Sequence, residues 1–429
     1  MNVLYFTLED FESIENNHSI NTDLLREFKR HGHNVFAVSP TERRKNLPTR
    51  LLFEEKTSEN NGNKRSGGRS VILKPRIGNI QKTKSFIEKG ISTVTIGWIL
   101  KRAIKKYLSS DYLGVDVKFD LIIYCTPPIT FLSAVEYVKK RDKARTYLLL
   151  RDIFPQNAVD LGMLRTTGLK GFLYKFFRRQ EKRLYAISDR IGCMSQANVE
   201  YLLKYNPEIK TDQVEVCSNC IEVIDKSLDE KTRVAIRKRH ALPLNKKIFV
   251  YGGNLGKPQG VPFIIECLRA CVDLEDCYFL IVGDGTERHL LVDYVESERP
   301  KNVTLMKQLP KEEYEQLVAA CDVGLIFLDH RFTIPNFPSR LLSYMSAKLP
   351  VLAATDKASD IGKAIVDGGF GWWCESDDSD KFLKAVLLCI EEMRKGQNVE
   401  TEFQYLRTFY SSEVACQQII AANLVDNCV

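Results

Sequence analysis

The sequence predicts an α/β protein built from two doubly wound domains, each around a parallel sheet. Short apolar runs rich in β-branched and aromatic residues recur along the chain, separated by segments of helix length. This alternation is typical of parallel strands joined by right-handed crossovers. At 429 residues the chain is too long for one ordinary core, and the pattern restarts after a candidate hinge at residues 218–227.

Composition narrows the class of protein. The chain is 44% apolar and 27% charged, with a net charge of +7. That charge suits an anionic membrane surface or phosphorylated ligands and does not demand nucleic acid. No apolar run approaches the roughly 20 residues of a membrane span, and the chain opens as a strand without a signal-peptide pattern. We therefore expect a cytoplasmic protein with reduced cysteines.

The first half opens as a β-α-β unit. Val3 to Phe6 reads as a strand, Ser19 to Phe28 as a helix with Ser19 as N-cap and Gly32 as C-cap, and Val35 to Val38 as the next strand. Residues 54–69 are polar and glycine-rich, which predicts a mobile loop. The pattern predicts further strands at 71–73, 121–124, 147–150, 191–195 and 214–217.

Two predicted helices of this half, at 90–108 and 168–185, carry aromatic residues flanked by cations. Such a helix is typical of the membrane interface. The alternative is a helix that packs on the sheet with its basic face in water. Both interpretations stay open at this point.

The second half begins with a buried strand, Ile248 to Tyr251, and a glycine-rich turn that ends at Gly260. Glycines allow close approach of a ligand, and backbone N–H groups at such a turn can bind phosphate; a merely tight turn is the alternative. The spacing is not G-x-G-x-x-G, so a nicotinamide oxidoreductase is not expected. Further strands are predicted at 278–282, 303–306, 323–328 and 351–354, and a terminal helix at 400–424.

These elements predict two domains. The first domain covers residues 1–220 and is completed by a C-terminal helix at 403–429, and the second covers residues 221–402. The carboxyl ends of two such sheets would face each other across a cleft, which is a site for a substrate pair.

Three segments of the second half carry a resemblance. They are Gly252 to Gly260 (GGNLGKPQG), Leu280 to Arg288 (LIVGDGTER) and Pro338 to Val351 (PSRLLSYMSAKLPV). In this order they resemble family 4 glycosyltransferases of the two-Rossmann-domain (GT-B) type, of O-antigen and capsule assembly. The subgroup is that of N-acetylaminosugar, L-fucosamine-like transferases. Residues 26–35 and 151–156 also resemble it.

The resemblance implies a donor site in the second half. The turn would offer backbone donors to a diphosphate, with Lys257 as a neutralising charge. Arg340, after Pro338-Ser339, would stabilise the departing nucleotide diphosphate, or form a surface salt bridge instead. Asp284 would lie near the nucleoside, or cap the next helix, and Lys307 near the base. The donor-binding candidates are Gly252, Gly253, Asn254, Lys257, Gln259, Gly260, Gly283, Asp284, Gly285, Lys307, Ser339 and Ser343.

One departure concerns the sugar contacts. The family's pattern ends in a glutamate that holds the ribose, and Ser343 stands there in this chain; Pro335 stands at the position of the first glutamate. Backbone groups of Thr333 to Phe337 are the expected replacement. A noncatalytic sugar-nucleotide or glycan-binding protein is therefore an alternative, and a sugar-nucleotide epimerase on the same architecture is another.

The first half supplies the acceptor candidates. Asp152 is the candidate catalytic or acceptor-orienting carboxylate, or it caps the following turn instead; Arg340 is the catalytic candidate on the donor side. Arg151 stands where the family often has a histidine, and His18 lies in the loop after the first strand. Both are acceptor-binding candidates.

The resemblance implies a retaining transferase that moves a hexosyl or N-acetylhexosaminyl group from a nucleotide-diphosphate sugar, with UDP as the expected nucleotide. The acceptor would be a lipid-linked saccharide or polysaccharide at the inner face of the cytoplasmic membrane. No cofactor is expected beyond the donor. No metal is expected either, because Asp378-Ser379-Asp380 reads as a helix cap.

Overall fold

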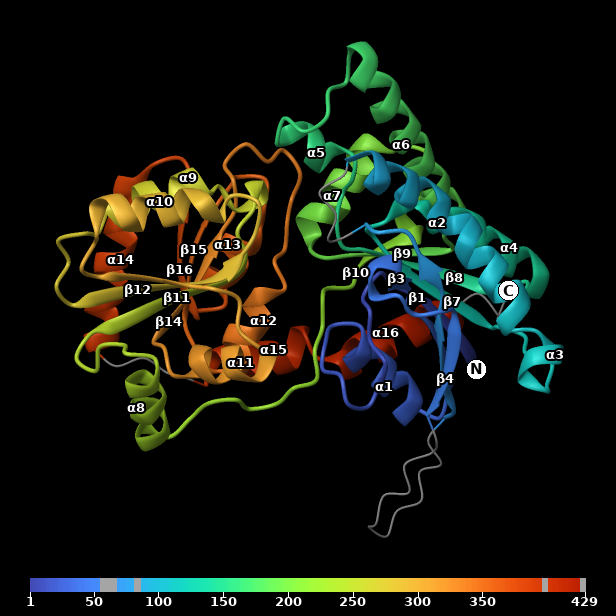
Figure 1. Ribbon diagram of the computed structural model, residues 1–429, viewed down its shortest axis with the longest axis horizontal. Coiled ribbons are helices and arrows are strands. Elements are labelled where there is room, and N and C mark those ends of the chain that lie inside the picture. Colours follow the sequence, from blue (N-terminus) through green and yellow to red (C-terminus); the bar gives the residue numbers. More distant parts are fainter. Residues whose placement is uncertain (55–67, 81–85, 396–399, 425–429) are drawn as a thin grey trace, which may run out of the picture. The chain divides into compact units, whose positions relative to one another are not determined.

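The computed structural model of the protein describes residues 1–54, 68–80, 86–395 and 400–424 (Figure 1). The chain divides into two compact units. The first contains residues 1–156, 164–222 and the chain from 411 onward, and the second contains residues 157–163 and 223–410. Most of the predicted loop at 54–69 lies outside the described residues.

The sheet of the first unit has the strand order β10-β9-β8-β7-β1-β2-β5-β4 in the described residues. Neighbouring strands are parallel except β4 and β5. A small parallel pair, β3 and β6, lies apart from it. The strands are β1 (Asn2–Phe6), β2 (Asn34–Val38), β3 (Thr41–Glu42), β4 (Arg50–Glu54), β5 (Ser70–Lys74), β6 (Arg76–Ile77), β7 (Leu121–Cys125), β8 (Arg145–Leu150), β9 (Arg190–Cys193) and β10 (Val214–Val216).

Helices cover both faces of this sheet. On one face α1 and α16 lie side by side (Figure 1), and on the other α2, α4 and α6 share an apolar cluster with the strands. The helices are α1 (Thr22–Arg30), η1 (Arg43–Lys45), α2 (Phe86–Tyr107), α3 (Ser110–Leu113), η2 (Ile129–Phe131), α4 (Leu132–Asp142), α6 (Gly168–Ile187), α7 (Gln196–Tyr205), η3 (Thr211–Gln213) and α16 (Ser412–Leu424). Helix α5 (Gln156–Asp160) spans the boundary to the second unit.

The sheet of the second unit is parallel throughout, in the order β13-β12-β11-β14-β15-β16. Its strands are β11 (Lys247–Asn254), β12 (Cys277–Asp284), β13 (Val303–Met306), β14 (Val323–Phe327), β15 (Val351–Thr355) and β16 (Gly371–Glu375). Its helices are α8 (Glu230–Arg239), η4 (Lys257–Gln259), α9 (Val261–Ala270), α10 (Arg288–Glu298), α11 (Lys311–Ala319), α12 (Arg340–Ser346), α13 (Ile361–Asp367), α14 (Ser379–Arg394) and α15 (Thr401–Phe409).

The order of these strands reverses between β11 and β14, which are neighbours in the sheet although β12 and β13 separate them in sequence. Ligands of open α/β sheets bind outside the carboxyl ends of strands at such a switch point. The glycine-rich turn follows β11, and the loop that leads to Arg340 follows β14. The topology therefore places both segments where a ligand of such a sheet is expected to bind.

Two predicted elements need correction, and some strands were not predicted. Helix α1 begins at Thr22, after a turn in which the Ser19 hydroxyl accepts the Thr22 N–H at 3.2 Å. Strand β4 at the antiparallel edge was not predicted. The predicted terminal helix is two helices, α15 and α16, because Ser411 forms a β-bridge with Ile221 and interrupts it.

Candidate active site

The glycine-rich turn lies directly beside the end of the neighbouring strand. Gly253 of β11 is paired with Gly283 of β12, and a Cβ on Gly283 would lie 2.0 Å from the Gly253 carbonyl oxygen. Likewise a Cβ on Gly285 would lie 2.4 Å from the carbonyl oxygen of Leu255. The structure thus brings the predicted donor residues of β11 and β12 together at one sheet edge, and glycine is required for that approach.

The turn uses most of its own backbone donors. The N–H of Leu255 binds the Asp284 carbonyl at 2.9 Å, and those of Gln259 and Gly260 bind carbonyls inside the turn at 3.1 and 3.0 Å. The Gly256 N–H binds the side-chain oxygen of Gln259 at 3.2 Å. The expectation that the turn as a whole offers backbone donors to a diphosphate is therefore wrong for these four residues. Their N–H groups stabilise the turn itself.

Two side chains of the turn are likewise engaged with each other. The Asn254 amide donates to the Gln259 side-chain oxygen at 3.0 Å, and the Tyr251 hydroxyl donates to the Asn254 carbonyl at 2.7 Å. Gln259 is buried, whereas Lys257 is exposed on η4. Positive charge at this turn thus comes from Lys257 or from another segment.

Arg340 supplies that charge from far along the sequence. It begins α12, and its guanidinium lies 4.3 Å from the centre of the Tyr251 ring. A Cβ on Gly253 would lie 3.5 Å from its Nη2 atom. Its Nη1 atom is buried and has no hydrogen-bond partner among the described residues. A buried guanidinium nitrogen without a partner is costly, and an anionic ligand would satisfy it.

Three tyrosines surround this guanidinium, of which Tyr251 and Tyr344 are buried and Tyr314 is half-buried. Tyr344 of α12 donates to the carbonyls of Val250 and Leu325 at 3.2 and 3.0 Å, so it joins the helix to β11 and β14. Burial raises the pKa of Tyr314 to about 12, and Arg340 opposes this shift. Burial would lower the pKa of Arg340, but the hydroxyls of Tyr251 and Tyr344 outweigh it and the pKa is raised. The cation is thereby held charged beside the turn.

The other predicted donor residues occupy the same edge. Exposed Asp284 ends β12, and its carboxylate accepts the N–H of Gly285 at 2.8 Å, so it caps this turn rather than the helix that follows. Lys307 is exposed immediately after β13. Ser339 lies just before α12, the short helix that begins with Arg340, and Ser343 lies in it; both serines are exposed. The sequence of α12, RLLSYMS, contains no carboxylate.

The loops after β14 and β15 contain functional candidates that sequence reasoning missed. Buried Asp329 follows β14 directly, accepts two hydrogen bonds from the Arg331 guanidinium at 2.8 and 2.7 Å, and lies against Gly260. Buried Asp356 follows β15 and accepts from the Ser359 hydroxyl at 3.0 Å. Burial raises the pKa of Asp356 to about 6. Both aspartates stand at carboxyl ends of buried strands, and that signal identifies them.

Some backbone N–H groups of the loop after β14 are also engaged in hydrogen bonds. The Thr333 N–H binds the Asp160 carboxylate at 2.8 Å, and the Asn336 N–H binds the Ser359 hydroxyl at 2.9 Å. We expected backbone groups of residues 333–337 to replace the missing glutamate. Two of these groups instead fix the shape of the loop.

In the first unit, Arg151 follows β8 and is anchored in the structure. Its Nη1 donates to Asn21 at 2.6 Å, and Nη2 donates to the Tyr5 hydroxyl at 3.3 Å. Burial would lower its pKa, but Tyr5 raises it. The backbone of the next residue, Asp152, is held at both its N–H and its carbonyl by the Thr126 hydroxyl, at 3.3 and 3.1 Å. Asn21, Tyr5 and Thr126 thus hold Arg151 and Asp152 in place. The sequence did not indicate these three partners.

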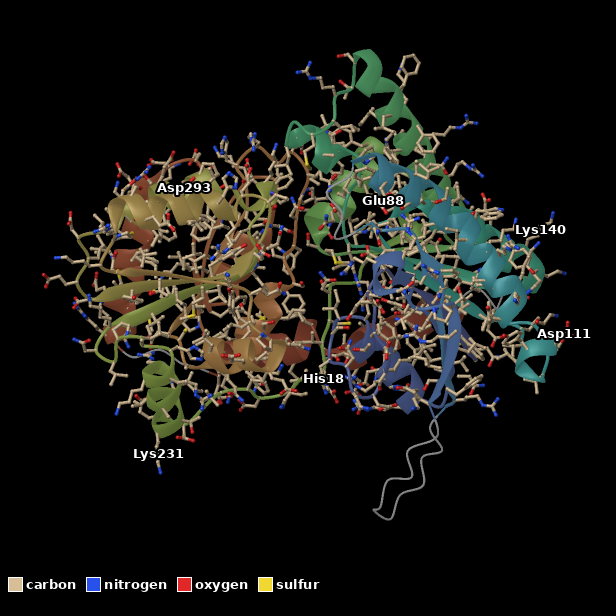
Figure 2. All side chains as sticks on the ribbon, in the orientation of Figure 1. His18, Glu88, Asp111, Lys140, Lys231 and Asp293 are labelled. Carbon is tan, nitrogen blue, oxygen red and sulfur yellow. The ribbon has the colours of Figure 1, made fainter. Side chains whose placement is uncertain are left out.

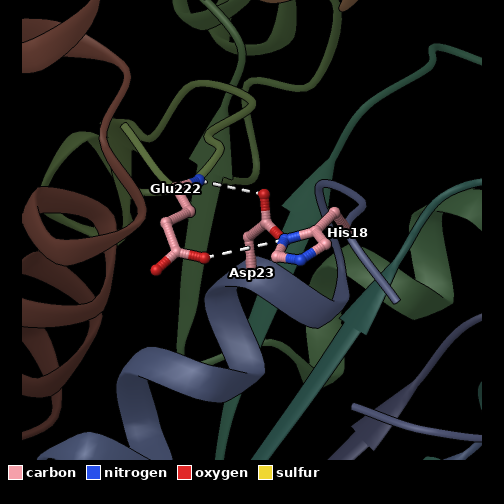
Figure 3. A group of neighbouring side chains, drawn as sticks. All are labelled: His18, Asp23 and Glu222. Carbon is pink, nitrogen blue, oxygen red and sulfur yellow. Dashed lines mark hydrogen bonds and ion pairs between the residues drawn. The ribbon is translucent and has the colours of Figure 1, made fainter. Parts of the chain in front are cut away.

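His18 lies at a separate charged cluster, shown in Figure 3. Its Nδ1 is 2.9 Å from an Arg26 guanidinium nitrogen and 3.7 Å from carboxylate oxygens of both Asp23 and Glu222. The three side chains have the composition of a metal site. However, the same Arg26 nitrogen also binds Asp23 and, at 3.1 Å, Glu222. A guanidinium therefore occupies the position that a cation would take.

The second unit's switch point lies in the part of the chain that matches a known family. A family model described as "Glycosyl transferases group 1" matches residues 232–402. That range holds the glycine-rich turn, the loop after β14 and Arg340. Residues 232–402 are therefore similar in sequence to that family.

Two relatives match this chain over a longer stretch than the family model does. The chain is 25% identical over 265 residues to WbjE of Pseudomonas aeruginosa, which is named as a probable glycosyltransferase. This match covers 60% of this chain and 63% of the relative. The chain is 26% identical over 255 residues to WcaI of Escherichia coli (strain K12), whose name places it in colanic acid biosynthesis. This match covers 57% of this chain and 60% of the relative. The matches thus span under two thirds of the length of either relative.

Solved structures resemble the whole chain in fold. HepE of Anabaena, crystallised in complex with UDP, aligns with a TM-score of 0.65 at 13% identity, over 98% of this chain and 99% of that one. WaaG, a glycosyltransferase involved in lipopolysaccharide biosynthesis, aligns with a TM-score of 0.63 at 13% identity, over 99% of both chains. Together with the two parallel-sheet units, these likenesses confirm the predicted GT-B fold.

Within the described residues, no helix combines the length and the apolar character that a bilayer crossing requires.

Proposed function

We propose that this chain is a retaining glycosyltransferase. It moves a hexosyl or N-acetylhexosaminyl group from a UDP-linked donor to a lipid-linked saccharide or polysaccharide in surface polysaccharide synthesis. The match to the group 1 family and the relatives named for polysaccharide synthesis support this class of reaction. The observation that carries the proposal is the unpartnered, buried Nη1 of Arg340 beside the glycine-rich turn.

The donor's diphosphate would lie at the switch point of the second unit. Because four N–H groups of the turn are engaged internally, the charge of Arg340 has to provide much of the binding, with exposed Lys257 as a second cation. A guanidinium can bind two phosphate oxygens at once. Asp284 and Lys307 would contact the nucleoside, and Ser339 and Ser343 would contact the sugar nucleotide from α12.

In the reaction, the bond between the anomeric carbon and the phosphate oxygen breaks. The electron pair passes to UDP, whose added charge Arg340 stabilises. The acceptor hydroxyl forms the new bond on the same face of the sugar, and its proton leaves to the phosphate. Asp152 orients that hydroxyl, while Arg151 and His18 bind the acceptor.

The reaction would not need a metal. Asp378 accepts the N–H of Asp380 at 2.8 Å and caps α14, so the one D-x-D segment considered as a metal motif has a structural role. Arg340 supplies the positive charge that a metal would bring to the diphosphate. Transfer measured in the presence of EDTA should therefore equal transfer in its absence. Loss of activity that Mg²⁺ or Mn²⁺ restores would contradict this.

Donor binding is tested by thermal shift with UDP and a panel of UDP-sugars. A ligand at 100 times its dissociation constant adds about 2.7 kcal/mol to the free energy of unfolding. We expect Arg340→Ala to abolish the shift and Arg340→Lys to retain part of it. Arg269→Ala is the matched control, because Arg269 lies on α9 in the same unit and pairs with Glu298 at 2.5 Å on the surface. A wild-type shift in Arg340→Ala would refute the assignment.

A noncatalytic binding protein is the second candidate, favoured by the absence of a carboxylate on α12. Membrane extract supplied as acceptor separates the two functions. Release of UDP that depends on the extract supports the transferase, whereas binding without release of UDP supports the binding protein.

A further inference from the structure

A short segment from the first half of the sequence belongs to the second unit. Residues 157–163 group with residues 223–410, whereas the chain on both sides of the segment belongs to the first unit. Helix α5 ends at Asp160, inside this segment, and Ala158 and Leu161 are buried. The segment is therefore a packed part of the second unit.

Backbone hydrogen bonds close this segment into a turn. The N–H of Gly162 binds the Val159 carbonyl at 2.9 Å. The N–H of Met163 binds the Ala158 carbonyl at 2.8 Å. Gly162 has a φ of +68°, the left-handed conformation that commonly ends a helix. These bonds enclose Asp160 and fix the direction in which its side chain leaves the backbone.

Asp160 stands where its own helix disfavours a carboxylate. It is the last residue of α5, and the last carbonyl groups of a helix carry partial negative charge. A partner elsewhere in the fold compensates for this. The carboxylate accepts the N–H of Thr333 at 2.8 Å, and the Thr333 hydroxyl lies 3.0 and 2.9 Å from its two oxygens. Both hydrogen-bond donors of Thr333 thus bind one charged group.

The loop that contains Thr333 connects β14 to α12 at the switch point of the second unit. At the start of the loop, the N–H of Asp329 binds the carbonyl of Pro258, in the glycine-rich turn, at 3.0 Å. A Cβ on Gly260 would lie 3.4 Å from the Asp329 Cα. The first part of the loop is thus attached to the turn beside which we place the diphosphate of the sugar donor.

The last part of the loop is attached to the segment that follows β15. The N–H of Asn336 binds the Ser359 hydroxyl at 2.9 Å, and this hydroxyl donates to buried Asp356 at 3.0 Å. Helix α12 begins soon after, with Arg340. Both ends of the loop are therefore held by residues around the second unit's own sheet. The carboxylate of Asp160 holds the stretch between these two attachments.

We infer that Asp160 is a positioning residue of the proposed donor site. Its carboxylate holds Thr333, and so gives the middle of the loop one shape, against which the transferred sugar is aligned. Ligands of such sheets bind outside the carboxyl ends of the strands at the switch point, which this loop borders. The diphosphate takes the glycine-rich turn and Arg340, so the middle of the loop is left for the sugar. The identity of the ligand rests on the proposed function, whereas the role of the α5 segment goes beyond it.

Calorimetric titration with UDP, UDP-glucose and UDP-N-acetylglucosamine tests the inference. UDP lacks the sugar, so Asp160→Ala should leave its dissociation constant within about twofold of the wild-type value. The same variant should raise the dissociation constant of the tighter-binding UDP-sugar by about tenfold, because the sugar then meets a loop without a fixed shape.

Two milder variants separate positioning from a general loss of structure. Asp160→Asn keeps an oxygen that can accept the Thr333 N–H, and it should recover most of the affinity for the UDP-sugar. Thr333→Val removes the hydroxyl alone and should raise the dissociation constant of the UDP-sugar by about threefold. Both variants should bind UDP as the wild type does.

The matched control is Asp293→Ala. Asp293, labelled in Figure 2, is exposed on α10 of the same unit, and its carboxylate pairs with no cation among the described residues. The control should bind UDP and both UDP-sugars as the wild type does. An equal loss in the control would overturn the inference. So would an unchanged affinity for the UDP-sugar in Asp160→Ala, or an equal loss for UDP and the UDP-sugar.

Hydrogen exchange of the chain without ligand gives a second readout. Asp160→Ala should speed exchange in residues 329–337 by about tenfold and leave β11 and β14 protected. Loss of protection in these strands as well would mean that the variant destabilises the whole unit, which contradicts a positioning role. Unchanged exchange in residues 329–337 would contradict it too.

Failure of this inference can be told apart from failure of the proposed function. Release of UDP by the wild type, together with an unchanged affinity for the UDP-sugar in Asp160→Ala, would refute the inference and leave the transferase standing. A loss confined to the UDP-sugar in Asp160→Ala, without release of UDP when membrane extract is supplied to the wild type, would keep the positioning role and refute the transferase. A wild type that binds neither UDP nor the UDP-sugars would refute both.

Discussion

Arg340 and Tyr251 form the contact on which the proposed donor site depends. The guanidinium lies over the buried aromatic ring at 4.3 Å and next to the backbone of Gly253. A ring face fixes a planar cation without neutralising it, whereas a carboxylate would compete with phosphate. Tyr251 is thus a positioning residue in the proposed reaction.

Removing the ring should weaken UDP binding selectively. A desolvated cation–π contact contributes about 2 kcal/mol, so Tyr251→Leu should raise the dissociation constant of UDP by about thirtyfold. Tyr251→Phe keeps the ring and should retain near wild-type binding. Phe249→Leu, a buried change two residues earlier on the same face of β11, controls for lost core packing. Calorimetric titration measures all three, and equal effects of the two leucine variants would refute the positioning role.

Glu402 is a second residue whose surroundings predict a measurable effect. It is fully buried in α15, and neither carboxylate oxygen has a hydrogen-bond partner among the described residues. Burial raises its pKa to about 7. Because the folded pKa is raised, the acid is protonated in the folded chain between its unfolded pKa and pH 7, and stability falls as pH rises through that window.

Glu402→Gln should remove this pH dependence. The amide resembles the neutral acid, so the variant should match the wild type near pH 5 and exceed it above pH 7 by about 3 kcal/mol in free energy of unfolding. Urea unfolding at the two pH values measures the difference. Asp356 has a raised pKa of about 6 as well, and it contributes the slope that remains below that pH. An unchanged slope between pH 5 and pH 7 in Glu402→Gln would contradict the assignment.

At the scale of elements, the packing of α11 against β11 explains why Gly252 is a glycine. A Cβ there would lie 1.8 Å from the Tyr314 hydroxyl, and the nearest ring carbons are 2.3 and 2.4 Å away. Phosphate binding is therefore not needed to account for this glycine. The helix and the strand require it.

Gly252→Ala should cost about 1–3 kcal/mol of stability, because the Tyr314 ring has to move. In a Tyr314→Ala background the same substitution should cost less, because the ring that meets the added Cβ is gone. Gly90→Ala is the control: it lies inside α2 with no atom within 4 Å of its added Cβ, and it should stabilise the chain by about 0.5–1 kcal/mol. Thermal unfolding of the wild type, the three single variants and the double variant tests this. If Gly252→Ala left the stability unchanged, the backbone at this position would be able to shift and accommodate a Cβ at little cost.

At the scale of the whole molecule, the end of the chain belongs to the unit in which it begins. Ala415, Cys416 and Ile419 of α16 are buried in one cluster with Leu24 and Phe28 of α1. Ile419→Ala should therefore destabilise the first unit by about 2–5 kcal/mol. Hydrogen exchange should show faster exchange in β1 and α1 and unchanged protection in β11 and β12. Val386→Ala on α14 should produce the converse pattern, since Val386 is buried in the second unit's core. Uniform loss of protection in both variants would mean that the units unfold together.

Much of this architecture could be predicted from sequence, because buried parallel strands are continuous apolar runs and the turn glycines mark their carboxyl ends. The break at Tyr410–Ser411 could not, since it depends on a β-bridge to Ile221, distant in sequence. At the site, Arg340 was identified by resemblance. Its tyrosine surroundings and the engaged N–H groups of the turn arise from tertiary contacts that no local pattern encodes. The roles of Asp152, Arg151 and His18 stay predictions.

The hydrogen-bonded amides of Thr333 and Asn336 bear on how the proposed transferase would change its sugar. Each N–H is held by a side chain of the same unit, so these two backbone donors are not available to a sugar ring. Discrimination between one sugar and the next must then fall to side chains. A point mutation replaces a side chain and leaves the peptide group in place. A new sugar preference would therefore need only a few point mutations and no change in the backbone of the loop.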